Sequence, residues 1–405
     1  MLILSLGITE LVSWGVLVYA FSVFLVPMRE GLGWSDAQLS GAYALGVVVS
    51  GLAAVPVGRW LDRRGPRALM TAGSVLAVIV VLAWARIGSL PGFYAVFAFA
   101  GLAMAATLYE PAFAMAARWF SARRAQAVLV LTIFGGLASV VFLPLSAWLV
   151  GSFGWRSALV ILAGILGVVC IPIHALVLRS PDRASPARDV EGSSGAGARL
   201  AQALRSRSFL WLTASLSIAT LGRIAISVHL VSYLAGRGYT LGEAALVTGG
   251  IGLLQIAGRA IATVVGTRGN EYRVYTTMFV IQGISLALPL ATSGHGAGAT
   301  AAVVAFVVLY GLGYGLPELI RGVSVADYYS LADYAGINGV LGFFVTLSRA
   351  AGPAAAGVAV SLSGSYTPML AGAGLAALVS AAALVAAERA HARERRGQAH
   401  VRTVD

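Results

Sequence analysis

Apolar residues dominate this chain in long, nearly uncharged runs separated by short polar connections. Each run has about the 20 residues that an α-helix needs to cross the hydrocarbon core of a bilayer. Gly and Pro recur inside the runs, as is common where membrane helices pack closely and bend. The pattern predicts an all-α membrane protein with twelve transmembrane helices. The runs fall near residues 2–28, 37–58, 68–88, 92–117, 126–150, 156–178, 209–234, 241–266, 273–293, 298–322, 336–361 and 367–388.

The composition fits a surface that faces lipid. Of the 405 residues, 59% are hydrophobic and only 11% are charged, whereas about a quarter of the residues of a soluble domain are charged. The formal net charge of +12 would suggest nucleic-acid binding in a soluble protein. In a membrane protein the placement of the charges matters more than their sum, so no nucleic-acid partner is expected.

The placement of arginine predicts the topology. All 28 basic residues are Arg. With the N-terminus inside, twenty of them lie in cytoplasmic segments, against Arg29, Arg86, Arg156 and Arg237 on the other face. Connections that stay in the cytoplasm carry the excess of basic residues. We therefore expect a multi-pass protein of the cell inner or plasma membrane with both termini in the cytoplasm. The first run is too long for a cleavable signal peptide.

The longest polar break divides the runs six and six. Residues 179–208 are rich in Arg, Ser, Ala, Gly and Pro and are predicted to form a cytoplasmic linker. This linker separates an N-terminal six-helix bundle, residues 1–178, from a C-terminal six-helix bundle, residues 209–388. Residues 389–405 are predicted to form a basic cytoplasmic tail. Two such halves are expected to be pseudo-symmetric, and the chain is expected to be a monomer.

Several classes of function are excluded by what the sequence lacks. A phosphate-binding loop of the form G-x-x-x-x-G-K-S/T requires a Lys, and the chain has none. Cys170 is the only cysteine, and there is no Cys/His metal cluster and no nucleophile elbow. We therefore expect no ATP-driven pumping by this chain alone, no metal, no cofactor and no enzymatic activity.

The connection after the second run carries the most specific motif. Residues 58–67 read GRWLDRRGPR and resemble the G-x-x-x-D-R-x-G-R-R loop of the major facilitator superfamily, with Asp62, Arg63, Gly65 and Arg67 in place. The resemblance extends over nearly the whole chain and implies that family's twelve-helix fold. An acid at a helix end can form ion pairs with arginines in one conformation and release them in the other. Asp62, Arg63 and Arg67 are therefore predicted to act in gating, although a basic loop that only sets topology is the alternative.

The second half holds a degenerate copy of this loop. It begins at Gly258 and Arg259, but Thr267 stands where the motif has its acid, and Arg268 keeps its place. Arg259 is included among the predicted gating residues. The lost acid predicts that a cytoplasmic latch differs between the two halves.

Two further stretches resemble one branch of the superfamily. Residues 119–124, WFSARR, and residues 154–156, GWR, are similar to the monocarboxylate and oxalate–formate transporters. One departure matters: an Asp–Arg pair on the eighth span of the monocarboxylate carriers is replaced by Gln255 and Arg259. Without that acid, the proton-coupling scheme of those carriers cannot be transferred to this chain. Arg349 lies on the eleventh span, where oxalate–formate relatives have a Lys.

Ionisable residues within the runs are the candidate site, because each costs about 2.5–3.5 kcal/mol to insert and needs a partner or water. The resemblance implies that the first, fourth, seventh and tenth spans line a central cavity. These spans carry Glu10, Glu110, Arg223, and Glu318 with Arg321. Both Glu110 and Glu318 lie beside a proline, which loosens a helix and suits a bending gate.

The charges predict roles for individual residues. Arg223 and Arg349 are predicted to bind a carboxylate, because a guanidinium group matches two oxygens. Glu10, Glu110 and Glu318 are predicted to couple protons. The alternative is that these acids only neutralise the arginines, with Glu318 paired to Arg321 on the same helix face. The aromatic residues Trp14, Tyr109 and Tyr314 are predicted to line the substrate site, and packing between helices is the alternative for them.

The sequence thus predicts a secondary active transporter of a small organic anion, with a monocarboxylate or similar carboxylate as the substrate. The expected mechanism is alternating access coupled to protons. The expected partners are the small-molecule substrate, the proton and membrane lipid. A proton-driven exporter of cationic or drug-like compounds stays open as an alternative. So does a ligand sensor that does not transport, although no signalling domain is present.

Overall fold

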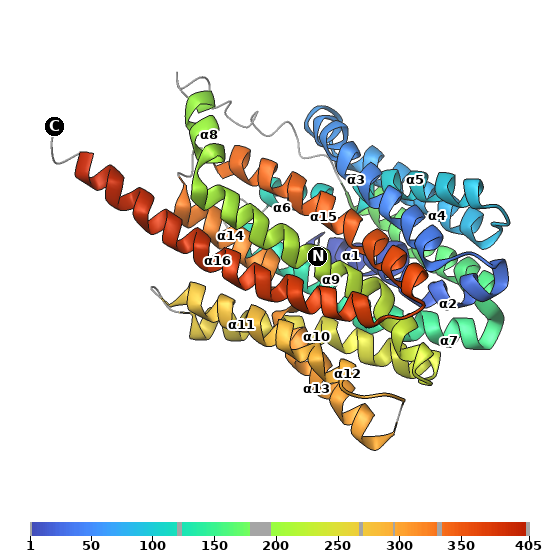
Figure 1. Ribbon diagram of the computed structural model, residues 1–405. Coiled ribbons are helices and arrows are strands. Elements are labelled where there is room, and N and C mark those ends of the chain that lie inside the picture. Colours follow the sequence, from blue (N-terminus) through green and yellow to red (C-terminus); the bar gives the residue numbers. More distant parts are fainter. Residues whose placement is uncertain are drawn as a thin grey trace.

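The chain is a bundle of long helices whose axes are roughly parallel to one another (Figure 1). A computed structural model describes residues 2–119, 124–178, 196–266, 270–294, 296–329 and 334–401, and no strand occurs among them. The elements of the first half are α1 (Leu2–Trp14), the π-helical η1 (Gly15–Tyr19), α2 (Ala20–Leu32), α3 (Asp36–Arg64), α4 (Pro66–Ala85), α5 (Leu90–Thr107), α6 (Tyr109–Trp119), α7 (Arg124–Pro172) and the π-helical η3 (Ile173–Val177). Those that follow are α8 (Ala196–Arg205), α9 (Arg207–Gly236), α10 (Leu241–Val265), α11 (Glu271–Ser285), α12 (Ala287–Leu290), α13 (Ala297–Tyr314), α14 (Leu316–Tyr328), α15 (Tyr334–Ser363) and α16 (Thr367–Val401).

The predicted twelve transmembrane helices are confirmed. Eleven helical stretches among the described residues are long and apolar enough to span a membrane. One of them, Val130–Val177, is 48 residues long, about twice what a bilayer requires. It contains two spans, because the backbone of Gly154 turns out of the helix at φ 75° and ψ 159°. A positive φ of this kind is readily adopted only by glycine. The two spans fold back at this residue.

The outer surface of the bundle is apolar, as lipid requires. Large aliphatic side chains are widely exposed around it, for example Leu362 at 84%, Val264 at 78% and Val168 at 77%. A soluble protein would not expose so many such side chains. Buried aromatic residues instead pack inside the bundle, for example in the first half, where Phe21, Trp84 and Phe97 meet at ring distances of 5.2–6.1 Å.

Three of the spans predicted to line the centre are interrupted. The first span contains the π-helical turn η1, and such turns often mark functional positions in helices. The fourth span breaks at Leu108 and the tenth at Gly315. Pro111 and Pro317 follow these breaks, in the first turn of α6 and α14, where a missing N–H costs nothing. Glu110 and Glu318 are thereby placed at corresponding helix beginnings, which favour negative charge.

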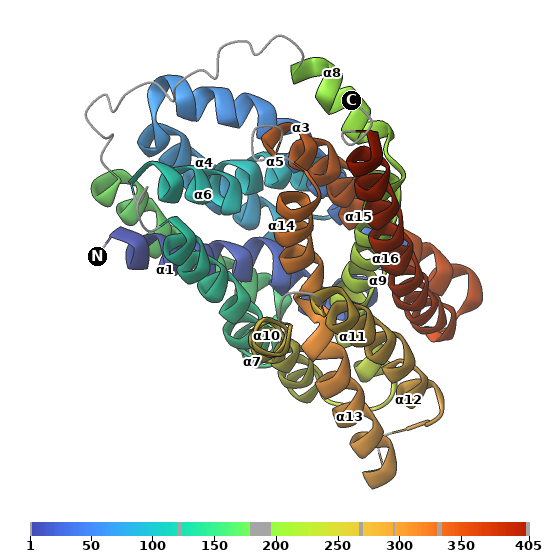
Figure 2. The same ribbon diagram turned by 90° about the vertical axis from the view of Figure 1, so that its left-hand side faces the viewer.

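The two halves meet where α10 lies beside α7 and α15 beside α3 (Figure 2), and small residues lie at both contacts. On α10, an added Cβ at Gly252 would stand 2.0 Å from Oγ of Ser139 and 2.8 Å from the carbonyl oxygen of Gly136, both on α7. On α3, a Cβ at Gly51 would stand 2.8 Å from the Cγ2 methyl of Thr346 on α15. Small residues let membrane helices approach closely. The α7–α10 and α3–α15 contacts therefore form the interface between the halves.

Candidate functional site

Two arginines share one carboxylate near the middle of the C-terminal half. Nη2 of Arg349 lies 3.0 Å from Oε1 of Glu318, and Nη2 of Arg223 lies 3.4 Å from the same oxygen. The three side chains come from α15, α14 and α9, so the cluster joins three separate helices. Two of its buried donors, Nε of Arg223 and Nε of Arg349, have no hydrogen-bond partner among the residues that the structure describes. The cluster carries one positive charge in excess and keeps unused donors.

Local structure explains why these side chains converge. Glu318 lies in the first turn of α14, directly after the break at Gly315, where the helix N-terminus favours a negative charge. Arg223 lies about sixteen residues into α9, roughly 24 Å along the helix and near the middle of the bilayer. Its guanidinium group lies over the Tyr314 ring, with Cζ 4.9 Å from the ring centroid. This cation–π contact holds the charge against the inner end of α13.

The corresponding region of the N-terminal half is aromatic. Nε1 of Trp14 donates to Oε2 of Glu10 at 3.0 Å, and the Trp14 ring lies 4.7 Å from the Tyr109 ring. Glu10 is completely buried, and its Oε1 has no hydrogen-bond partner. A side chain at Gly135 would collide with the Tyr109 hydroxyl, since an added Cβ would stand 2.0 Å from it. Gly135 thus makes room for the aromatic pair.

Glu110 is the predicted site residue that connects the two halves. Its side chain is exposed, and no ion pair to it occurs among the residues that the structure describes. It interacts electrostatically with Arg349 of the other half and with Glu10 of its own. Tyr19 is likewise close enough to Arg223 and Tyr314 to interact with them electrostatically. Groups from both halves therefore face a common region, although Glu10 itself is sealed against Trp14.

The direct ion pairs of Glu318 are with arginines on α9 and α15, whereas Arg321, its possible partner by spacing, acts on it electrostatically. Nε of Arg321 instead donates to Oδ1 of Asn338 on α15, at 3.0 Å. Spacing along one helix makes a pair possible, but Glu318 points toward arginines on two neighbouring helices. Sequence reasoning missed this pairing because it depends on contacts between elements that are far apart in the chain.

Arg259, one of the predicted gating residues, lies at the break in the tenth span. Its Nε donates to the carbonyl oxygen of Gly315 at 3.2 Å, and its Nη2 donates to Oε1 of Gln255 at 3.4 Å. A Cβ at Gly315 would stand 2.5 Å from that Nε, so glycine permits the approach. Gln255 in turn faces Gly136 of the N-terminal half. Arg259 thereby ties the bend of α13 and α14 to the interface between the halves.

The other predicted gating residues lie at the end of α3 and the beginning of α4. Arg63 and Arg67 are exposed, and no ion pair to the second half is found for either of them within the described part of the chain. The side chain of Asp62 lies outside the described residues, as do Thr267 and Arg268. The latch between the halves therefore stays a prediction.

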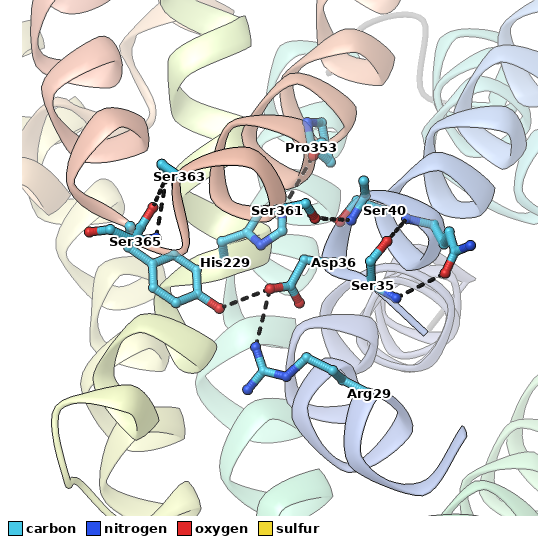
Figure 3. A network of polar contacts seen from close by, with 12 residues as sticks. Arg29, Ser35, Asp36, Ser40, His229, Pro353, Ser361, Ser363 and Ser365 are labelled. Carbon is cyan, nitrogen blue, oxygen red and sulfur yellow. Dashed lines mark hydrogen bonds and ion pairs between the residues drawn. The ribbon is translucent and has the colours of Figure 1, made fainter. Parts of the chain in front are cut away.

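A polar network at the opposite end of the bundle was not predicted (Figure 3). Nη1 of Arg29 donates to Oδ2 of Asp36 at 3.1 Å, and the Tyr366 hydroxyl donates to the same oxygen at 3.4 Å. Burial raises the pKa of Tyr366, and the charge of Asp36 raises it further. Tyr366 therefore keeps its proton and acts as a donor. In the sequence, Asp36 only resembles the acidic first turn of a helix.

The same network continues between the halves through His229 of α9. Its Nε2 lies 3.1 Å from Oγ of Ser40 on α3 and 3.2 Å from the carbonyl oxygen of Pro353 on α15. The backbone N–H of Ala37 donates to Oγ of Ser361 at 3.2 Å. Side chains of both halves therefore close this end of the bundle (Figure 3). His229 thus lies in this closure.

The sequence as a whole matches a known family. A family model described as Major Facilitator Superfamily matches residues 11–321, more than half of the chain. The chain belongs to this superfamily. Monocarboxylate transporter 13 of Bos taurus is 27% identical over 333 residues, which cover 79% of this chain and 75% of that protein. The oxalate:formate antiporter of Oxalobacter formigenes is 26% identical over 276 residues, which cover 66% and 62%.

Solved structures agree with the superfamily fold. A bacterial homologue of the human lysosomal transporter Spinster, in an inward-facing and occupied conformation, has a TM-score of 0.71 at 16% identity and covers 96% of this chain and 94% of its own. The nucleoside transporter NupG has a TM-score of 0.70 at 14% identity, with 97% and 99% covered. At such identities only the fold is shared. This superfamily member is a transporter and not an enzyme, as its sequence predicted.

Proposed function

We propose that this transporter moves a small organic anion, a monocarboxylate or a similar carboxylate, by alternating access coupled to protons. The observation that carries the proposal is the pair of guanidinium groups, from Arg223 and Arg349, that share Oε1 of Glu318. Two positive charges against one negative charge at the depth of the membrane attract an anion, and arginine matches the two oxygens of a carboxylate. The relatives are named for the transport of monocarboxylates, oxalate and formate, and these names support a negatively charged substrate.

In the proposed cycle, the substrate competes with Glu318 for the two arginines. A carboxylate that contacts Arg223 and Arg349 takes these partners from Glu318 and brings a second negative charge close to it. Repulsion between the two carboxylates favours a proton on Glu318. Substrate and proton therefore bind together. Of the three acids predicted to couple protons, Glu318 is the one in direct contact with these arginines.

The conformation supports alternating access. The end that bears Arg29, Asp36 and Tyr366 is held closed by contacts between the halves. The predicted topology places this end on the outside, and the exposed Arg63 and Arg67 on the cytoplasmic side. The structure then corresponds to the state that is open to the cytoplasm, and rocking of the halves would expose the arginines to the outside.

A second candidate function rests on Glu110. Its exposed carboxylate has no ion pair among the described residues, as a site for an organic cation would require. In that case the chain exports cationic compounds in exchange for protons, and Arg223 and Arg349 are structural. The two candidates differ in the sign of the charge that the transporter accepts.

The test is uptake into proteoliposomes. Labelled lactate and oxalate serve as anions and labelled tetraphenylphosphonium as the cation, with and without an inward proton gradient. We expect saturable uptake of a carboxylate and its loss in Arg349→Gln. Arg86→Gln is the control, because Arg86 is exposed at the end of α4 and is not among the arginines that act on Glu318. Movement of the cation, or unchanged carboxylate uptake in Arg349→Gln, would show that the proposal is wrong.

A further inference from the structure

The last helix is longer than the membrane is thick. α16 runs from Thr367 to Val401, and 35 helical residues extend about 52 Å, against a hydrocarbon core of about 30 Å. Roughly twenty residues after Thr367 cross the core, so the helix leaves it near residue 387. Arg389 and Arg393 then lie at the level of the lipid headgroups. The end of α16 projects beyond the rest of the bundle (Figure 1).

A groove lies between α16 and the beginning of α9 at this level. Its volume is about 390 Å³. The basic part of its lining is Arg207, Arg389 and Arg393, and the three arginines make no ion pair with any residue that the structure describes. The lining also includes one acid, Glu394. Three positive charges therefore converge on one space at the surface.

Glu394 offsets only one of the three positive charges, so the lining keeps a net charge of +2, and both oxygens of its carboxylate are already hydrogen-bonded. Its Oε2 accepts the hydroxyl of Ser208 at 2.6 Å, and its Oε1 accepts the backbone N–H of Ser208 at 3.3 Å. The Tyr329 hydroxyl lies 3.1 Å from the same serine oxygen. This contact fixes the extended part of α16 against the start of α9. It therefore preorganises the arginines of the two helices.

Below the arginines the groove becomes apolar. Ala382, Val385 and Ala386 line it one to two turns earlier on α16, at the depth of acyl chains. Trp211, one turn into α9, lines the same groove and is 47% exposed, and tryptophan is typical of the membrane interface. An adjoining hollow of about 440 Å³ shares Arg207 and Trp211. The groove is therefore cationic at the level of the headgroups and apolar at the depth of the acyl chains.

We propose that this groove binds an anionic phospholipid of the cytoplasmic leaflet. The phosphate contacts Arg207, Arg389 and Arg393, and an acyl chain lies along Ala382 and Ala386. Arginine pairs with phosphate through two parallel hydrogen bonds, and basic residues at the inner surface attract anionic lipid. Because α9 also carries Arg223, the lipid stabilises the helix that presents one of the substrate arginines.

The experiment measures binding to the full chain purified in a neutral detergent. Dioctanoyl phosphatidylglycerol, dioctanoyl phosphatidylcholine and inorganic phosphate are added separately, and thermal unfolding and native mass spectrometry report binding. We expect phosphatidylglycerol to raise the unfolding temperature and to remain bound, whereas the zwitterionic lipid has little effect. Arg389→Gln with Arg393→Gln should weaken binding on the order of tenfold or more.

Matched controls keep the result decisive. Arg273→Gln with Arg395→Gln removes two exposed arginines from the same half but none from the groove, and should bind lipid like the wild type. Ala382→Phe keeps every charge and fills the apolar part, so it should also lose binding. Equal losses in both double arginine variants, an equal effect of inorganic phosphate, or unchanged binding in Ala382→Phe would each overturn the proposal. Failure of the lipid test would leave the substrate proposal untouched, because none of these residues contacts Glu318.

Discussion

Replacing Glu318 by Gln tests how the anion and the proton are linked. Gln has nearly the same shape as Glu and the charge of its protonated form. In the wild type, Oε1 of Glu318 forms ion pairs with Nη2 of Arg349 at 3.0 Å and with Nη2 of Arg223 at 3.4 Å. An arriving carboxylate must therefore displace this oxygen. The substitution removes that competitor without opening a cavity. We therefore expect Glu318→Gln to bind the substrate more tightly than the wild type at neutral pH.

The size of the effect follows from the two contacts. A hydrogen bond to a charged group contributes about 1.5–3 kcal/mol, and one of the two here is long. The side chains of Glu318 and Arg349 are 36% and 30% exposed, so solvent screens the interaction and the lower range applies. A net gain of about 1–2 kcal/mol corresponds to roughly 5- to 30-fold tighter binding.

The assay is equilibrium binding of a labelled carboxylate to purified protein between pH 5.5 and 8. Because a bound carboxylate favours a proton on Glu318, proton uptake should accompany binding, and wild-type affinity should rise toward that of Glu318→Gln as the pH falls. The variant should bind with little dependence on pH, and in proteoliposomes it should exchange substrate without responding to a proton gradient. Weaker binding in Glu318→Gln at pH 7.5, or a pH dependence equal to that of the wild type, would refute the competition.

Three further predictions concern other parts of the molecule. Asp36→Asn should loosen the outer closure. In a background without the native cysteine, a cysteine introduced at Ser40 should then react several-fold faster with a membrane-impermeant maleimide. Unchanged labelling would argue that the network does not hold this end closed. Gly252→Val should separate the halves, because even a Cβ would stand 2.0 Å from Oγ of Ser139. The unfolding temperature should fall by several degrees and uptake should be lost. A normal melting curve with full uptake would contradict this packing. Glu10→Gln keeps the acceptor for the indole N–H of Trp14 and removes a completely buried carboxylate. Stability should therefore be unchanged or higher, and carboxylate affinity should change less than about twofold. A large loss of affinity would place Glu10 in the substrate site.

Periodicity and charge placement were sufficient to predict the twelve-helix fold. Apolar length almost alone determines a membrane helix, because only helices and closed barrels satisfy the backbone within lipid, and continuous apolar runs of about 20 residues have the length of helices. The positions of the breaks in the fourth and tenth spans could also be approached, since Pro111 and Pro317 mark them. The end of the last helix could not be predicted in this way. The apolar run near 367–388 ends where α16 leaves the membrane, but the helix continues to Val401.

Pairings between helices could not be obtained in the same way. The sequence indicated which residues carry buried charge but not which helix face meets which. Glu318 and Arg321 have the spacing of a helical pair, yet Glu318 contacts Arg223, 95 positions away. The outer network was missed for the same reason, because Asp36 and Tyr366 are 330 positions apart. Such contacts depend on the relative rotation of packed helices, which one sequence does not determine.

The charges around the candidate site favour the binding of an anion. Arg223 and Arg349 share Glu318, Arg321 acts on the same carboxylate from a greater distance, and Glu110 acts on Arg349 from the other half. These five side chains carry one positive charge in excess, and net charge at membrane depth is costly. A bound carboxylate removes that excess, and because it competes with Glu318 for the same arginines it favours a proton on Glu318. An organic cation would instead add to the positive charge, beside two arginines whose Nε donors have no hydrogen-bond partner among the described residues, which is why the geometry favours the anion.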